Sequence, residues 1–177
     1  FPNGYTYRRL IDITDAQVSA GPHTNFPILF SSTITDLKTT ANGGDVTDAQ
    51  GDDIIFTDSD GTTQLAHEVE KYTATTGELV AWVRVPSLAA TSTIYIYYGN
   101  SSVTTFQGNV TSNGVTGVWD ANYKGVWHLK EDPSGTAPQM KDGTANANHG
   151  TSAGTMTSTD QVAGQVDGSL DFDGIND

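Results

Sequence analysis

The stretch formed by residues 53–100 most restricts what this chain can fold into. Apolar and polar residues alternate along it in short runs, which are separated by turn-forming Gly, Asp, Asn and Pro. Alternation with a period of two predicts a half-buried β-strand, because successive side chains of a strand point to opposite faces. Strands that recur about every 8–12 residues are typical of a sandwich of two sheets. The predicted strands are residues 54–56, 64–72, 79–85 and 93–98.

Weaker signals predict further elements on either side of this stretch. Residues 5–13 alternate with a period of two, and residues 28–30 form a short apolar run after a proline. Proline is tolerated at the head of a strand or on a sheet edge. Residues 35–51 are polar and are predicted to form a loop with one helical turn near residues 36–39, while residues 169–173 alternate again.

The composition favours an all-β protein. Hydrophobic residues make up 36% of the chain and charged residues only 16%, so the polar remainder is mostly Thr, Ser, Gly and Asn. These residues suit strand surfaces and turns, whereas helix surfaces are rich in Glu, Lys and Arg. We therefore predict an antiparallel β-sandwich of jelly-roll-like form, followed by a partial second β-sandwich.

Charge and cysteine content exclude several classes of function. The net charge is −13, with 8 Lys and Arg against 21 Asp and Glu, and such a surface repels nucleic-acid phosphates. The chain has no cysteine, which excludes disulfides, thiolate metal sites and a cysteine nucleophile. No apolar run approaches the ~20 residues that a membrane-spanning helix needs. The chain begins at Phe1 without a signal peptide, so we expect it to be a mature or trimmed part of a longer protein.

Four motifs in a fixed order resemble a known family. Residues 4–100 contain YRRLIDI, DIIFTDSDGTTQLAHEVE, LVAWVRVPSL and STIYIYYGN. Together they resemble an uncharacterised domain family of secreted bacterial and archaeal proteins, which typically precedes a lectin-like sandwich. The resemblance implies a β-sandwich module that acts outside the cell.

The C-terminal part resembles a second family. GVWHLKED, DGTANANHGT and VAGQVDGSLDFDGIND are similar to the start of a concanavalin A-like lectin/laminin-G domain. Such domains are more than twice as long as this part of the chain, so we expect a fragment of a longer protein. The alternative is that its strands pair with the first domain or with another copy. The expected division is a sandwich module at 1–106, a linker at 107–116 and an incomplete lectin-like domain at 117–177.

Catalysis has one weak candidate pair. Glu68 and Glu70 are two residues apart on a predicted strand, so their carboxyl groups share a face, as glycoside hydrolysis would require. The residues around them resemble a signature of lectin-like hydrolases, but they lie in the first domain and not in the lectin-like one. The chain has no G-x-S-x-G or G-x-G-x-x-G motif. We expect no enzymatic activity.

Calcium is the cofactor that the sequence allows. Asp58 and Asp60 resemble the front of a calcium loop, but Val69 stands where an EF-hand has its chelating Glu. Asp142 and Asp173 lie among amides and carboxylates in Gly-rich loops and offer further oxygen ligands. The alternative is that all four aspartates simply form turns.

Aromatic residues are the candidates for glycan binding. Trp82, Tyr95 and Tyr97 lie on predicted strands, and Trp119 begins the C-terminal part. Core packing is the alternative for each of them, since aromatic side chains suit buried strand faces. Trp127, in an apolar run, is expected to be core.

These observations favour a non-catalytic extracellular module of a secreted or surface protein. It would bind a polysaccharide or a cell-surface glycan, or mediate adhesion. One alternative is a structural subunit of an extracellular filament or surface assembly, built by strand exchange between copies. Another is an accessory part of a polysaccharide-degrading enzyme. Arg8 and Arg9 either protect a sheet edge or clamp a carboxylate or sulfate.

Overall fold

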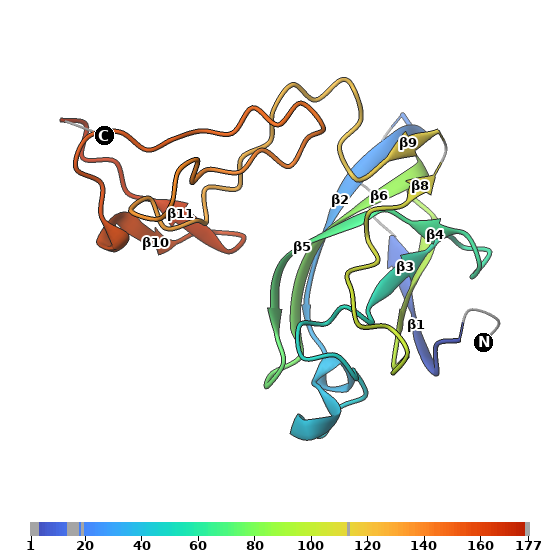
Figure 1. Cartoon of the computed structure of the whole chain (residues 1–177). Coiled ribbons are helices and arrows are strands. Elements are labelled where there is room, and N and C mark those ends of the chain that lie inside the picture. Colours follow the sequence, from blue (N-terminus) through green and yellow to red (C-terminus); the bar gives the residue numbers. More distant parts are fainter. Residues whose placement is uncertain (1–3, 14–17, 19, 113, 176–177) are drawn as a thin grey trace. The chain divides into compact units, whose positions relative to one another are not determined.

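The computed structural model describes residues 4–13, 18, 20–112 and 114–175. Regular structure in these residues consists of antiparallel strands and three single-turn 3₁₀ helices, so the chain is all-β as predicted. Within the described residues, no helix is long and apolar enough to cross a membrane. The chain divides into two compact units, Phe1–Val118 and Trp119–Asp177 (Figure 1).

Two antiparallel sheets build the first unit (Figure 1). The four-stranded sheet has the order β1-β7-β3-β4 and the three-stranded sheet the order β2-β6-β5. Strands adjacent in the second sheet are long, and β2 pairs with β6 over almost its whole length. The bounds in the first sheet are β1 Tyr7–Ile13, β7 Ser92–Tyr98, β3 Ile55–Thr57 and β4 Gln64–Leu65. Those in the second are β2 His23–Thr33, β6 Glu78–Leu88 and β5 His67–Thr73.

The core lies between the two sheets. Phe56 of β3 contacts Phe30 of β2 edge-on, with ring centroids 5.6 Å apart, which joins the first sheet to the second. Full burial of a Leu, Ile, Val or Phe side chain stabilises a fold by about 1.5–3 kcal/mol. Alternate residues of β6 and β7 supply most of the buried side chains: Leu79, Ala81, Val83, Val85, Ile94, Ile96 and Tyr98.

The prediction of one strand over residues 64–72 is wrong, because the chain changes sheets in its middle. β4 ends at Leu65 and pairs with β3, whereas β5 begins at His67 and pairs with β6. Buried Ala66 alone makes the crossing. Leu65 and Ala66 are consecutive buried apolar residues, and nothing in the sequence shows that the strands on either side of them join different sheets.

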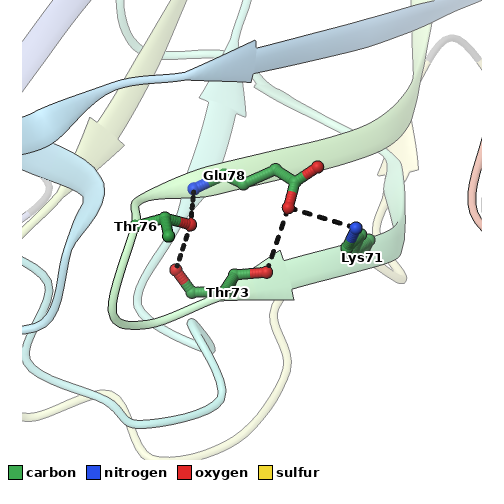
Figure 2. Close-up of polar contacts among 4 residues, drawn as sticks. All are labelled: Lys71, Thr73, Thr76 and Glu78. Carbon is green, nitrogen blue, oxygen red and sulfur yellow. Dashed lines mark hydrogen bonds and ion pairs between the residues drawn. The ribbon is translucent and has the colours of Figure 1, made fainter.

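The β5–β6 hairpin carries a bulge and a set of polar contacts between Lys71, Thr73 and Glu78, which we call the polar clasp. The register shifts between Val69 and Lys71, which leaves Glu70 as the extra residue. Beyond the bulge, the Glu78 carboxylate accepts a hydrogen bond from Thr73 at 3.2 Å and lies 3.1 Å from Lys71 Nζ (Figure 2). These contacts hold the strand pairing near the turn.

A buried carboxylate organises the loop before β3. Asp53 is fully buried and accepts hydrogen bonds from both the backbone N–H and the hydroxyl of Thr47, at 2.9 and 2.6 Å. The N–H groups of Gly99 and Asn100 donate to the same oxygen at 3.2 Å. The helical turn expected nearby is confirmed as η1, Thr35–Leu37, and a second turn, η2, spans Thr40–Asn42.

Residues that were expected to form a linker carry a short hairpin. It consists of β8, Thr111–Ser112, and β9, Val115–Thr116, and belongs to the first unit. Ser112 Oγ accepts a hydrogen bond of 3.1 Å from Arg84, whose side chain is fully buried on the outer face of β6. This hairpin therefore covers one end of that face.

The second unit consists mainly of loops. It contains a two-stranded antiparallel sheet, β10 (Gln161–Ala163) and β11 (Gly168–Leu170), and the turn η3 (Ser158–Asp160). The expectation that Trp127 is a core residue is wrong, since 44% of its surface is exposed. Its indole N–H donates to the backbone oxygen of Asn148 at 2.8 Å, so it serves to hold a loop. The second sandwich stays a prediction.

Candidate functional site

The solvent-facing side of the β2-β6-β5 sheet presents a tryptophan at its centre. Trp82 lies on the middle strand, between Leu29 of β2 and Glu68 of β5 in the pairing register. Residues 79, 81, 83 and 85 of the same strand fill the core, so Trp82 points to the opposite, outer face. We call Trp82, Leu29, Glu68 and Glu70 the Trp82 face.

The bulge in β5 fixes the orientation of the indole ring. Glu70, the extra residue at the bulge, accepts a hydrogen bond of 2.9 Å from Trp82 Nε1. Glu70 is only 6% exposed, whereas Glu68 and Trp82 are half-buried. Buried acceptors of this kind hold a side chain in one rotamer, so the ring is preorganised for contact with a ligand.

A pocket of about 670 Å³ adjoins the Trp82 face. The residues that line it are apolar except for Asp12, and they extend from Trp82 along β2 to the end of β1. Small-molecule sites are concave, mostly apolar and equipped with a few polar groups, which fits this combination of pocket and carboxylates. The residues contributed by β1 and β2 are Ile11, Asp12, Ile13, Phe26, Pro27, Ile28, Leu29 and Phe30.

Tyr95 and Tyr97 lie on the other sheet, away from Trp82. The Arg8 guanidinium stacks over the Tyr95 ring, with its Cζ 4.6 Å from the ring centroid. Tyr97 is fully buried; its hydroxyl accepts a hydrogen bond from Arg8 and donates one to Gly61 O. Tyr95 therefore has a partly exposed ring that is already covered by Arg8, and Tyr97 has no exposed face.

The two neighbouring arginines do not form one clamp. Arg8 is held against the tyrosines, and its pKa is raised mainly by the hydrogen bond with Tyr97. Arg9 points to the opposite side of β1 and pairs with Asp36 at 2.9 Å.

The fourth aromatic candidate, Trp119, belongs to the second unit. It is 8% exposed and packs edge-on against Tyr123, with ring centroids 5.1 Å apart. Sequence reasoning thus placed four aromatic residues in one class. Within the first unit, the structure brings only Tyr95 and Tyr97 into contact, edge-on with ring centroids 6.3 Å apart, and only Trp82 and Tyr95 reach the surface to a substantial extent.

The acidic turn before β4 uses its carboxylates to hold itself. Asp60 accepts hydrogen bonds from the hydroxyl and N–H of Thr63 and from the N–H of Thr62. These bonds, led by that of the Thr63 hydroxyl, lower the pKa of Asp60 to about 2. Asp58 accepts from the Ser59 N–H at 2.6 Å. Both residues act as turn formers in this structure.

Asp142 is the centre of the loop network in the second unit. One carboxylate oxygen accepts from the N–H groups of Val126 and Thr144, the other from the Thr144 hydroxyl and the N–H of Asn148. Burial would raise the pKa of Asp142, but the combined hydrogen bonds outweigh it and hold the pKa well below its usual range. Four donors therefore surround this carboxylate and stabilise its charged form.

Asp173, the remaining metal candidate, accepts from the N–H of Ile175 at 2.8 Å in an exposed turn. Across residues 4–13, 18, 20–112 and 114–175, no three His, Asp or Glu side chains gather in the way that a metal site requires. The four aspartates are therefore separate features of three different loops.

Sequence reasoning missed the role of two residues. Glu70 was considered only as a catalytic carboxylate, although its side chain positions Trp82. The bulge that brings it there was hidden, since a regular period of two through residues 67–72 gave no sign of an extra residue. Asp53 was not considered as a site residue, although its buried carboxylate ties the loop before β3 to the N–H groups of residues 99 and 100.

Comparison with known families matches part of the chain. Residues 50–125 match a family described as a domain of unknown function, DUF2341. This match confirms the expected resemblance of that part to an uncharacterised domain family, and its description gives no activity. Searches among curated proteins and among solved structures returned no match.

Proposed function

We propose that the chain is a non-catalytic extracellular module that binds a polysaccharide or cell-surface glycan, and so serves recognition or adhesion. The observation that carries the proposal is the half-buried Trp82, preorganised by Glu70 on the solvent-facing side of the β2-β6-β5 sheet. Its extracellular location is inferred from the motifs that resemble a secreted family.

The chemistry of the Trp82 face suits a sugar. A pyranose ring presents apolar C–H groups that pack on an indole face, and hydroxyl groups that donate hydrogen bonds to carboxylates. Glu68, directly opposite Trp82 in the register, supplies such an acceptor. The pocket beside Leu29 adds apolar surface next to the ring.

The two glutamates of this face have unequal roles. Glycoside hydrolysis needs two carboxyl groups that flank the scissile bond, both available for proton transfer or attack. Glu70 is buried and accepts the indole N–H, which suits positioning, and only Glu68 is placed to meet a ligand. This difference supports binding rather than turnover.

Calcium remains a prediction for this module. Ligand binding to the native state raises the melting temperature, so a structural ion would be detected as a lower melting temperature in EDTA that added Ca²⁺ restores. Equal melting curves in EDTA and in Ca²⁺ would contradict a structural calcium ion, and the aspartates would then serve only to form turns.

Affinity electrophoresis in gels that contain a series of neutral and acidic polysaccharides tests the proposal. We expect the chain to be retarded by at least one of them, and Trp82→Ala to lose the retardation. Loss of one aromatic stacking contact of about 1–1.5 kcal/mol corresponds to roughly tenfold in affinity.

Trp127→Ala is the matched control, because it removes an exposed indole from the other unit. Glu68→Gln keeps the shape of the site and tests the acceptor without disturbing the Glu70 bond. Equal retardation of Trp82→Ala and the unchanged chain, or no retardation on any polysaccharide, would contradict the proposal. Release of reducing sugars by the unchanged chain would replace it with the enzyme alternative.

A further inference from the structure

Strand β2 is an uncharged sheet edge in a highly acidic chain. It lies at the end of the β2-β6-β5 order, so one side of it has no neighbouring strand within the described residues. None of its 11 residues, HTNFPILFSST, is Asp, Glu, Lys or Arg, although the chain carries a net charge of −13. The edge strand of the other sheet, β1, contains Arg8, Arg9 and Asp12. Charged residues and prolines on an edge oppose strand addition; β2 has no charged residue and one proline, Pro27.

The register identifies which backbone groups of β2 face outward. The Arg84 N–H donates to Ala66 on the β5 side of β6, so Arg84 bonds away from β2. Its neighbours Val83 and Val85 must then bond to Ile28 and Phe26, because alternate residues of a strand bond to opposite sides. The residues of β2 whose backbone groups point to the free edge are consequently Pro27, Leu29, Ser31 and Thr33.

The outward groups of Leu29, Ser31 and Thr33 belong to exposed residues. Among the described residues, the N–H and C=O groups of Leu29, Ser31 and Thr33 make no hydrogen bond on this side. Pro27 is buried and has no N–H, so the exposed part of this edge begins at Leu29. A row of such groups can pair with another extended backbone, which provides partners for most of them.

Apolar side chains flank the same edge. Leu29 is 40% exposed and Phe26 45%, and the pocket of about 670 Å³ runs along residues 26–30. On the core side it reaches Ile11 and Ile13 of β1. An added strand would therefore find apolar surface for its alternate side chains on both faces.

We propose that β2 is the site at which a second copy of this chain adds, by antiparallel pairing of β2 with β2. The pairing joins two three-stranded sheets into one continuous sheet of six strands around a two-fold axis. A second copy is the occupant because its own β2 offers the same outward groups and brings no charge to the contact. Elsewhere, the net charge of −13 makes two copies repel each other.

The outward groups select the register. With Phe30 on the axis, Leu29 of each copy lies opposite Ser31 of the other, and each such pair exchanges two hydrogen bonds. Pro27 then lies opposite Thr33; because Pro27 is buried and has no N–H, the pairing rests on the two Leu29–Ser31 pairs. The inference does not depend on the proposed glycan binding, although it would place two Trp82 faces on one sheet.

The mass of the full chain in solution tests the pairing. Light scattering over a range of protein concentrations is expected to show the mass rise from that of one chain towards that of two. Higher NaCl concentration should strengthen the association by screening the repulsion between acidic copies. A concentration-independent monomer overturns the proposal, even if the chain binds a synthetic strand of another sequence.

Two variants assign the association to the β2 edge. Ser31→Pro removes an outward N–H and no bond to β6, and Leu29→Lys places a charge on the edge; both are expected to remain monomeric with melting curves close to that of the unchanged chain. Ser31→Ala keeps the N–H, and Leu10→Lys alters an exposed leucine of β1; both should still associate. Association that survives Leu29→Lys and Ser31→Pro, or that is lost in Leu10→Lys, overturns the assignment.

Discussion

The two units of this chain are stabilised by different interactions. The first has a continuous apolar core, contributed by both sheets. In the second, the buried apolar side chains among the described residues are only Trp119, Met140 and Leu170. Its loops are instead tied to Asp142 by hydrogen bonds. The comparison shows that apolar burial stabilises the first unit, whereas hydrogen bonds to a carboxylate stabilise the second. Loss of a core side chain should therefore weaken the first unit, and loss of the carboxylate the second.

The largest effect is expected from Phe56→Ala. Phe56 is fully buried between the sheets, and truncation of a buried Phe costs about 3–5 kcal/mol because a cavity remains. Urea unfolding followed by tryptophan fluorescence and circular dichroism would measure this loss. A loss below about 1 kcal/mol would contradict a core that is packed between the two sheets around Phe56.

Acid should weaken the first unit through His67. Burial between Phe56 and Phe106 lowers the pKa of His67 to about 4, whereas the unfolded value is 6.5. The unfolded chain therefore binds the proton more readily, and the stability present above about pH 6.5 is lost as the pH falls to about 4. The difference corresponds to at most roughly 3 kcal/mol.

Unfolding free energies measured from pH 7 to pH 4 would test this prediction. In His67→Leu, which has no titrating group at this position, the slope over that range should become flatter. An unchanged slope would assign the acid sensitivity to other groups.

Asp142→Asn should loosen the second unit and leave the first intact. The amide that replaces one oxygen is itself a donor, so it opposes the N–H groups that now converge on the carboxylate. Hydrogen exchange followed by mass spectrometry is expected to become faster in residues 123–150 and to stay unchanged in β6 and β7. Asp132→Asn is the control, because that carboxylate serves only a local turn. Faster exchange in both units would show that they unfold together.

The smallest effect is expected from Lys71→Met. The pair between Lys71 and Glu78 is partly exposed, and such pairs contribute about 0.2–1 kcal/mol (Figure 2). The melting temperature should fall slightly, and the fall should vanish in high salt. A large loss would mean that the clasp, rather than the core, determines the β5–β6 register.

The strands of the first unit could be predicted because their alternation reflects burial on one face. Residues 79–85 and 93–98 were predicted as strands and lie within β6 and β7. The crossing at Ala66 and the bulge at Glu70 could not, since both depend on which sheet a strand joins. Local alternation carries no information about that choice.

The candidate site was only partly predictable for the same reason. Trp82 was identified as an aromatic residue that could face solvent. The hydrogen bond that Glu70 accepts from it was not predicted, because it joins two neighbouring strands. Trp127 was misjudged, since its neighbours are apolar while its own unit has little core to enter. The network around Asp142 also escaped prediction, because Asn and Asp in loops have many possible partners.

The crossing at Ala66 limits how far the two sheets of the sandwich can move relative to each other. It joins β4 and β5, the outer strands on one side, while β1 and β2, the outer strands on the other, border the apolar pocket. One residue between two strands leaves almost no slack, so the sheets cannot slide apart there. Any rocking of one sheet against the other must then appear as widening or narrowing of the β1–β2 side. A ligand or partner bound on that side would therefore restrict this motion.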